Sequence, residues 1–248
     1  MPISYTTRNI SDTWTASKLL AQVDSLLKSI GFSVVAANTY SVTSPVSLAP
    51  KDKTFIRVDV TQPAAGQILF QVNMGDGVSG STLINSAPLS NSIIYHTVNQ
   101  LFSLRFVTLN SPEVKLVAWH RPEAGAIGII GIVFPSIRPE YWPSNGLYAL
   151  GGVNDQMLPL RATSGNPLIS GYADSHYLGN CPISINPAGY RDIIKRLIIP
   201  YNNGVMGQTG ADIGMMAASG LTPLSEYETM GEVWLTIREG SSLAFRIA

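Results

Sequence analysis

The chain has 248 residues, a length that suits one large domain or two small ones. Basic and acidic residues number 16 each, so the formal net charge is zero and the basic surface of a nucleic-acid-binding protein is not expected. Charged residues make up 13% of the chain, about half the usual share, and uncharged polar residues and glycine take their place. Proteins with few charges and no net charge tend to associate, so the composition favours an assembled state.

The sequence also limits the compartment and the chemistry of the protein. Cys181 is the sole cysteine, which excludes a disulfide within the chain and a zinc site built from several thiolates. Residues 1–10 are polar and lack the apolar core of a secretory signal. The longest apolar stretch, residues 125–134, is shorter than the roughly 20 residues that a membrane helix needs. We therefore expect synthesis in the cytoplasm and no membrane segment.

The first element that the sequence predicts is a helix from Asp12 to Ile30. Ser11 or Thr13 is suited to cap its first turn, and Gly31 stands where a C-terminal glycine is common. Apolar residues recur at helical spacing, at Trp14, Ala16, Leu19, Leu20, Val23, Leu26, Leu27 and Ile30. This stripe predicts an amphipathic helix that packs on a sheet.

Strands are predicted where apolar and polar residues alternate, or where short apolar runs end at turn residues. The predicted strands are residues 32–37, 54–60, 67–74, 105–109, 114–120 and 126–134. Short connections between them, at Pro112-Glu113 and at residues 121–125, predict two antiparallel hairpins, and residues 54–60 are expected to pair with 67–74. Residues 90–104 suit a short helix.

The chain changes character near Pro135. Residues 135–186 are rich in proline, glycine and asparagine, which predicts long surface loops with short strands. Residues 187–199 are expected to be partly helical around Asp192–Leu197, and residues 232–238 and 243–247 predict a C-terminal hairpin.

The predicted fold class is therefore α+β: a mainly antiparallel β-sheet with an N-terminal amphipathic helix and long irregular loops. Residues 1–134 would hold the helix and the sheet. Residues 135–248 would form a loop-rich region with the hairpin, either in the same domain or in a second one. Segments 75–92, 141–180 and 201–225 carry few charges, and we expect neighbouring subunits to order them.

The patterns that mark common catalytic and metal sites are missing from the sequence. The three histidines are not spaced as metal ligands, and the glycines at 207, 210 and 214 lack the lysine and the preceding strand of a phosphate-binding loop. No serine lies in the G-x-S-x-G pattern of hydrolases. We therefore predict no enzyme activity, no catalytic residue, no metal and no cofactor.

Aromatic residues within the polar loops are the remaining candidates for a surface that binds a partner or a sugar. They are Tyr141, Trp142, Tyr148, Tyr172, His176 and Tyr177. Aromatic side chains with few charges between them are typical of protein interfaces, and the same residue types line sugar-binding surfaces. The alternative is that Tyr141 and Trp142 anchor a proline-rich loop to the sheet.

The order of features resembles structural proteins of tailed-bacteriophage virions. The similarity lies in the N-terminal segment TWTASKLLAQVDSLLKSIGFSV (13–34), the strand pair TFIRVDVTQPAAGQILFQVNMGDG (54–77), and the end of the chain, PISINPAGYRDIIKRLIIPY (182–201) with GEVWLTIREGSSLAFRIA (231–248). The resemblance is one of layout and covers about half of the chain. It implies a virion component present in many copies, but it transfers no functional residue.

Together, composition and resemblance predict a structural subunit of a tailed-phage virion, in the tail, baseplate or neck, with a capsid-associated place still open. Its partners would be copies of itself and other virion proteins. The alternative is a carbohydrate- or receptor-binding module of a tail fibre, which would bind a host-surface glycan. In either case the protein is expected in the virion after synthesis in the host cytoplasm.

Overall fold

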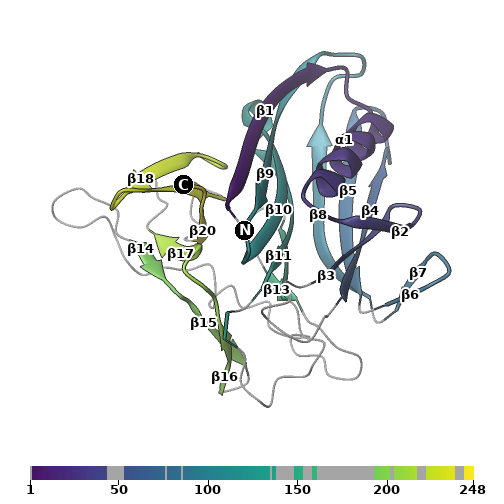
Figure 1. Cartoon of the computed structure of the whole chain (residues 1–248). Coiled ribbons are helices and arrows are strands. Elements are labelled where there is room, and N and C mark those ends of the chain that lie inside the picture. Colours follow the sequence, from purple (N-terminus) through teal and green to yellow (C-terminus); the bar gives the residue numbers. More distant parts are fainter. Residues whose placement is uncertain are drawn as a thin grey trace.

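A computed structural model gives the fold (Figure 1). It describes residues 2–43, 53–75, 77–84, 86–134, 136–137, 148–152, 158–160, 193–201, 204–216, 222–237 and 243–248. Within these residues the fold consists mostly of antiparallel β-sheet, as the sequence predicted, and α1 (Ala16–Ser29) is the single α-helix.

Three larger sheets contain most of the described strands. The central sheet has the order β1-β9-β10-β11-β12-β13. Its strands are β1 (Ser4–Asp12), β9 (Phe102–Asn110), β10 (Val114–Arg121), β11 (Ala126–Val133), β12 (Tyr148–Gly152) and β13 (Leu158–Leu160). The N-terminal sheet has the order β2-β3-β4-β5-β8. Its strands are β2 (Ser33–Ala36), β3 (Thr39–Thr43), β4 (Lys53–Thr61), β5 (Gln67–Gly75) and β8 (Ala87–Tyr95).

The C-terminal sheet has the order β14-β17-β20-β19-β18. Its strands are β14 (Ile193–Lys195), β17 (Ile213–Met216), β20 (Leu243–Arg246), β19 (Glu232–Thr236) and β18 (Glu226–Thr229). Two further strand pairs are β6 (Gly77–Ser79) with β7 (Thr82–Ile84), and β15 (Ile198–Tyr201) with β16 (Gly204–Gln208).

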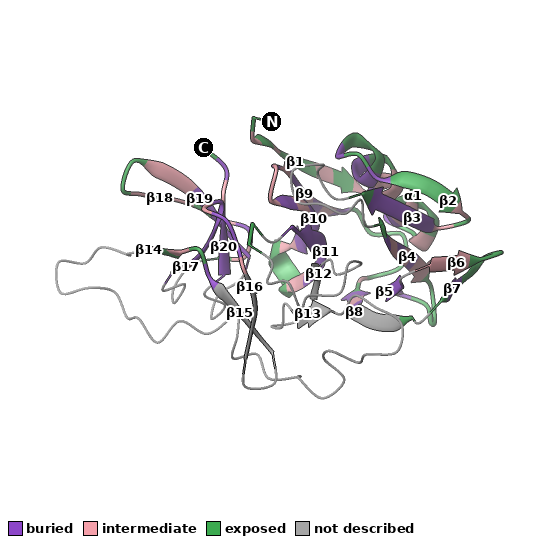
Figure 2. Ribbon diagram, turned by 60° about the horizontal axis from the view of Figure 1, so that its bottom comes forward, coloured by how far each residue is buried: buried purple, intermediate pink, exposed green. Residues whose placement is uncertain are grey.

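The central sheet has a hydrophobic core on each of its faces. Along β10, Val117 and Trp119 belong to the core shared with the N-terminal sheet and α1, while Leu116 and Ala118 belong to the core shared with the C-terminal sheet. Successive residues of a strand point to opposite faces, so a strand buried on both faces needs apolar residues throughout. This explains the unbroken apolar run at residues 126–133, and Figure 2 shows these central strands as buried.

The helix starts later than the sequence suggested, and it is the second element rather than the first. Residues 4–12 form β1, which pairs in continuous register with β9 from Ser4↔Asn110 to Asp12↔Phe102. The side chain of Thr15 then caps α1 by accepting a hydrogen bond from the backbone N–H of Lys18 at 3.3 Å. The face of α1 that packs into the core consists of Leu19, Val23, Leu26 and Leu27.

The pairing of the predicted strands is confirmed in three places. β4 and β5 are antiparallel, with Val58 opposite Val72. β9, β10 and β11 form the two predicted hairpins. β19 and β20 pair antiparallel at the C-terminus, with Leu235 opposite Phe245.

Other predictions of local structure were wrong. Residues 90–104 do not form a helix, because they contain the end of β8 and the start of β9. Ile94 on β8 and Leu104 on β9 are both buried in the core between the N-terminal and central sheets. The described part of segment 75–92 is strand rather than irregular loop. Residues 193–195 form β14 instead of a helical turn, and Asp192 lies outside the described residues. Gly207 and Gly214 lie on strands, and the missing side chain of Gly214 leaves room for that of Ile193.

Candidate functional site

Of the six predicted site residues, the structure describes Tyr148 alone. Tyr148 is the first residue of β12, where its backbone pairs with Val133. The other five predicted residues lie outside the described part of the chain: Tyr141, Trp142, Tyr172, His176 and Tyr177. The aromatic surface therefore stays a prediction.

A different surface stands out at one end of the two packed sheets, between β8 and β9. Tyr95, Val98 and Leu101 are 61%, 51% and 63% exposed, although all three have large apolar side chains. We call these three residues the apolar tip. Tyr95 ends β8, and Val98 and Leu101 lie in the short connection that follows, which is at the upper end of the molecule in Figure 1. Exposed apolar side chains that lie close together in the chain can mark a contact with another molecule.

The backbone of the apolar tip is held by hydrogen bonds to its surroundings. The backbone N–H of His96 donates to the carbonyl of Gly66, in the β4–β5 connection, at 2.8 Å. Gly66 has φ of +74°, and a Cβ there would overlap the carbonyl oxygen of His96, so glycine is needed for this contact. The N–H of Gln100 donates to Thr97 O at 3.0 Å and closes the turn.

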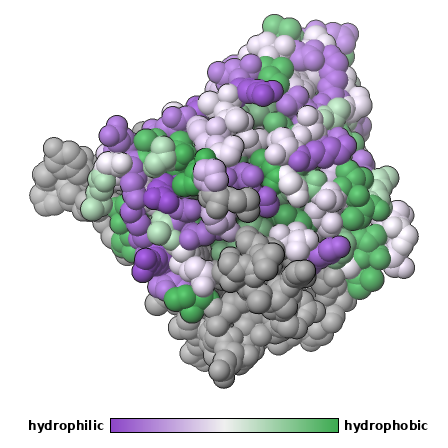
Figure 3. Space-filling view, viewed as in Figure 1, coloured by the Kyte–Doolittle hydropathy of each residue, from purple (hydrophilic) through white to green (hydrophobic). Residues whose placement is uncertain are grey.

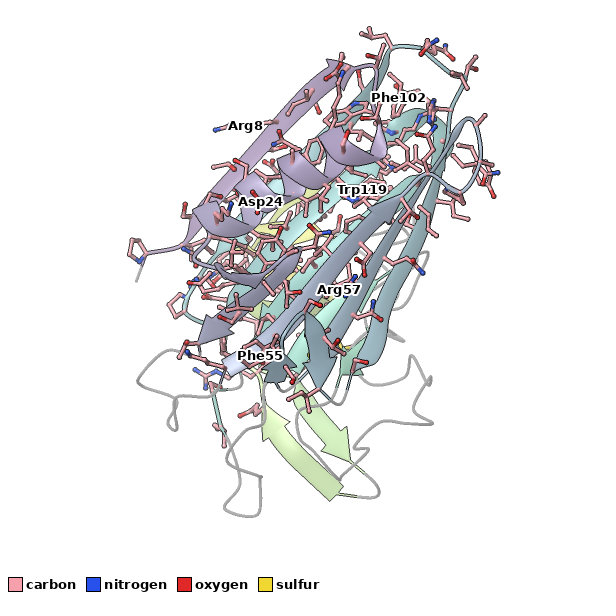
Figure 4. The ribbon with its side chains drawn as sticks, turned by 90° about the vertical axis from the view of Figure 1, so that its right-hand side faces the viewer. Arg8, Asp24, Phe55, Arg57, Phe102 and Trp119 are labelled. Carbon is pink, nitrogen blue, oxygen red and sulfur yellow. The ribbon has the colours of Figure 1, made fainter. Side chains whose placement is uncertain are left out.

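Phe102 forms the base of the tip, at the upper end of the sheets in Figure 4. Its ring is buried, with the Arg121 guanidinium 4.3 Å above the ring centroid and the His96 ring 5.4 Å away. Arg121 also donates a hydrogen bond to the carbonyl of Tyr95. The indole N–H of Trp14 donates to Phe102 O at 3.1 Å, which ties the segment before α1 to the same base. The exposed side chains thus project from a rigid support.

The electrostatics of the tip are close to neutral. The cation at its base, Arg121, lies 3.7 Å from the carboxylate of Glu123, which is the more exposed partner. The three exposed side chains of the tip itself carry no charge. His96 Nδ1 lies 3.0 Å from the carbonyl of Thr97. This arrangement suits contact with an apolar surface better than acid–base chemistry.

A cluster of charged side chains lies on the C-terminal sheet. Arg246 contacts Asp212 at 2.5 Å and Glu232 at 3.4 Å, and Lys195 contacts Glu232 at 2.5 Å. Burial acts to raise the pKa of Glu232, but Lys195 and Arg246 outweigh it and hold that pKa below its ordinary value. Two cations and two anions neutralise one another here, so the cluster joins β14, β19 and β20 rather than attracting a charged ligand.

Glu113 links the central sheet to the C-terminal sheet. Its carboxylate accepts the backbone N–H of Asp212 at 2.9 Å and occupies the space that a side chain at position 210 would fill. Burial raises the pKa of Glu113, and the hydrogen bonds from the backbone N–H groups of Asp212 and Ala211 act against that rise. Position 113 is thus a turn residue with a structural role, which its place in the sequence did not reveal.

Metal ligands do not gather in the described ranges: no three His, Cys, Asp or Glu side chains there lie close enough to hold an ion. In the same residues, no helix has the length and apolar character needed to cross a membrane.

Comparisons with known proteins leave the family of this chain open. No model of a known protein family matches it, and no curated protein matches it either.

Proposed function

We propose that the chain is a structural subunit of a tailed-phage virion, a component of the tail, baseplate or neck, that acts through protein–protein assembly and catalyses no reaction. The virion assignment derives from the layout of the sequence and from its low content of charged residues. The observation that carries the assembly role is the apolar tip, with Tyr95, Val98 and Leu101 more than half exposed on a well-supported loop.

The physical argument concerns the free energy of association. Removing exposed apolar area from water contributes roughly 25 cal/mol per Å², and an uncharged tip adds little cost for desolvating ions. A loop already held by Gly66, Phe102 and Arg121 loses little conformational freedom on binding. The tip is therefore suited to insert into an apolar recess of another virion protein.

The test has two parts. First, particles purified from the source lysate are analysed by quantitative mass spectrometry, and the chain is expected in a fixed ratio to the other virion proteins. Second, the double variant Val98→Asp and Leu101→Asp is compared with Met230→Asp, a control at a residue that is 76% exposed in the β18–β19 turn. The tip variant should fail to enter particles while the control enters normally. Absence of the wild-type chain from particles, or equal incorporation of both variants, contradicts the proposal.

The alternative function is a carbohydrate- or receptor-binding module of a tail fibre. It is favoured by the 61% exposure of Tyr95, since sugars stack on exposed aromatic rings. A glycan array distinguishes the two functions. Binding of a defined glycan that is lost in Tyr95→Ala would support the alternative, whereas incorporation into particles without glycan binding supports the assembly role.

A further inference from the structure

β2 lies at the edge of its sheet, and among the described residues its outer side is open. β2 is the first strand in the order of the N-terminal sheet, and no described strand pairs with its outer side. Val34 and Val35 are 49% and 44% exposed. Figure 2 shows β2 as an exposed strand at the margin of the molecule. Unpaired N–H and C=O groups at a sheet edge can pair with another strand.

Natural proteins usually protect such an edge with a charge, a proline or a bulge. The outer strand of the central sheet follows this rule, because β1 carries the exposed Arg8 at its centre, which points away from the molecule in Figure 4. β2 has a register shift between Val34 and Ala36, but it contains no charge and no proline. The sequence has no charged residue at all between Lys28 and Lys51.

The surface beside β2 is apolar as well. Figure 3 shows hydrophobic residues gathered on the right-hand side of the molecule, where β2 and the β6–β7 hairpin lie. The β6–β7 hairpin packs beside β4 and β5, and its last residue, Ile84, is 43% exposed. β2 therefore lies on a side of the molecule where apolar residues gather.

We propose that β2 pairs antiparallel with β2 of a second copy of this chain, so that two N-terminal sheets join into one. A contact across a two-fold axis places the same residues on both sides, so any charge at its centre would meet its own copy. β2 avoids this repulsion because it is neutral, whereas β1 would bring Arg8 close to Arg8 of the second copy. Pairing would also cover Val34 and Val35, whose exposed methyl groups favour burial.

This inference rests on the proposed assembly function and names one of its partners. A pair of four-residue strands is short, so the isolated dimer is expected to be weak. In a particle, many copies held close together raise the effective concentration of each partner and reinforce such a contact.

The main experiment measures self-association of the full chain by sedimentation velocity over a concentration series. Wild type is compared with the double variant Val34→Lys and Val35→Lys. The control is Ile194→Lys, which changes a β-branched residue of similar exposure, 46%, on β14. Wild type and control are expected to dimerise alike, and the double variant at least tenfold more weakly. Thermal unfolding of all three confirms that the variants are folded.

Cysteine cross-linking gives a second measurement that does not depend on introduced charge. In a Cys181→Ser background, single cysteines at positions 33–36 are oxidised, with Ile194→Cys as the control. Covalent dimers are expected from one or two positions on β2 and not from the control.

A wild type that stays monomeric at every concentration overturns the β2 inference. Dimerisation unchanged by the lysine variant, or cross-linking no better on β2 than at position 194, overturns it too. The virion proposal is tested apart from this, by presence in particles and by the tip variant, and it stands if the chain enters particles without β2 pairing.

Discussion

Trp119 on β10 lies directly opposite Gly128 on β11, and a Cβ at Gly128 would overlap the indole ring. Trp119 is buried between the central and N-terminal sheets, as Figure 4 shows, and its ring meets Phe70 edge-on at 5.6 Å. The glycine thus makes room for one of the largest side chains in the core. A glycine inside a strand commonly marks such a close approach.

Gly128→Ala should therefore destabilise the protein by about 1–3 kcal/mol, because the added methyl group forces the indole of Trp119 out of its position. Urea unfolding followed by tryptophan fluorescence measures the change. A Trp119→Phe substitution in the same background should recover part of the loss, since the smaller ring leaves room for the methyl group. An unchanged free energy of unfolding for Gly128→Ala would show that the core adapts without cost.

The packing of α1 gives a second prediction. Leu27 is fully buried between the sheets, so Leu27→Ala should cost roughly 2–5 kcal/mol through lost apolar contact and the cavity left behind. Ser25→Ala on the exposed side of the same helix should change stability by less than about 0.5 kcal/mol. The two variants are compared by urea unfolding. A loss below about 0.5 kcal/mol for a folded Leu27→Ala would contradict the packing of the helix.

Local patterns predicted the strands whose burial can be recognised from the spacing of apolar and polar residues within the strand itself. Alternation at residues 54–60 and 67–74 marks strands with one buried face, and the apolar run at 126–134 marks a strand buried on both faces. β1 escaped prediction because an edge strand buries little, and its sequence SYTTRNISD is nearly all polar. β8 and the start of β9 were mistaken for a helix because Ile93, Ile94, Val98, Leu101 and Phe102 also fit helical spacing.

The candidate site was missed for the same reason. The apolar tip lies within the segment predicted as a helix, where Val98 and Leu101 would have belonged to its apolar face. The link between Glu113 and Asp212 joins residues 99 positions apart, and no local pattern records such a distance. One usable signal was present in β9. Val107 and Leu109 point to one face of the strand and Phe106 to the other, so apolar residues lie on both faces. This implies a sheet that is covered on both sides, and hence a third layer.

The contact between Glu113 and the segment before β17 yields a third prediction. Gly210→Ala should displace the Glu113 carboxylate, break its hydrogen bond to the N–H of Asp212 and cost about 1–3 kcal/mol. Hydrogen exchange should become faster at Asp212. Glu113→Gln should have a smaller effect, because the amide oxygen still accepts the bond.

A double-mutant cycle shows whether the glycine acts through the carboxylate. Once Glu113→Ala has removed the side chain, adding Gly210→Ala should cost little more. Full additivity of the two losses would mean that Gly210 is required for some other reason than the space it leaves for Glu113.

The last prediction concerns alkaline pH and the contact of β1 with β18. Tyr5 donates a hydrogen bond to Glu226 Oε1 at 2.8 Å. Burial, together with this bond and the charge of Glu226, raises the pKa of Tyr5 to about 12 from an ordinary value of 10.0. Arg105, 3.7 Å from Glu226, acts in the opposite direction and does not cancel the rise.

The sign of the effect follows from proton binding. Above pH 10 the unfolded chain loses the phenol proton while the folded protein keeps it, so the free energy of unfolding falls as pH rises toward 12. The stabilising contribution of Tyr5 is therefore complete below pH 10 and is lost across this window. Urea midpoints of wild type and Tyr5→Phe, measured from pH 9 to 11.5, should converge as the pH increases, because the phenylalanine variant has no proton to lose. Parallel curves for the two proteins would mean that Tyr5 does not form this bond to Glu226 in solution.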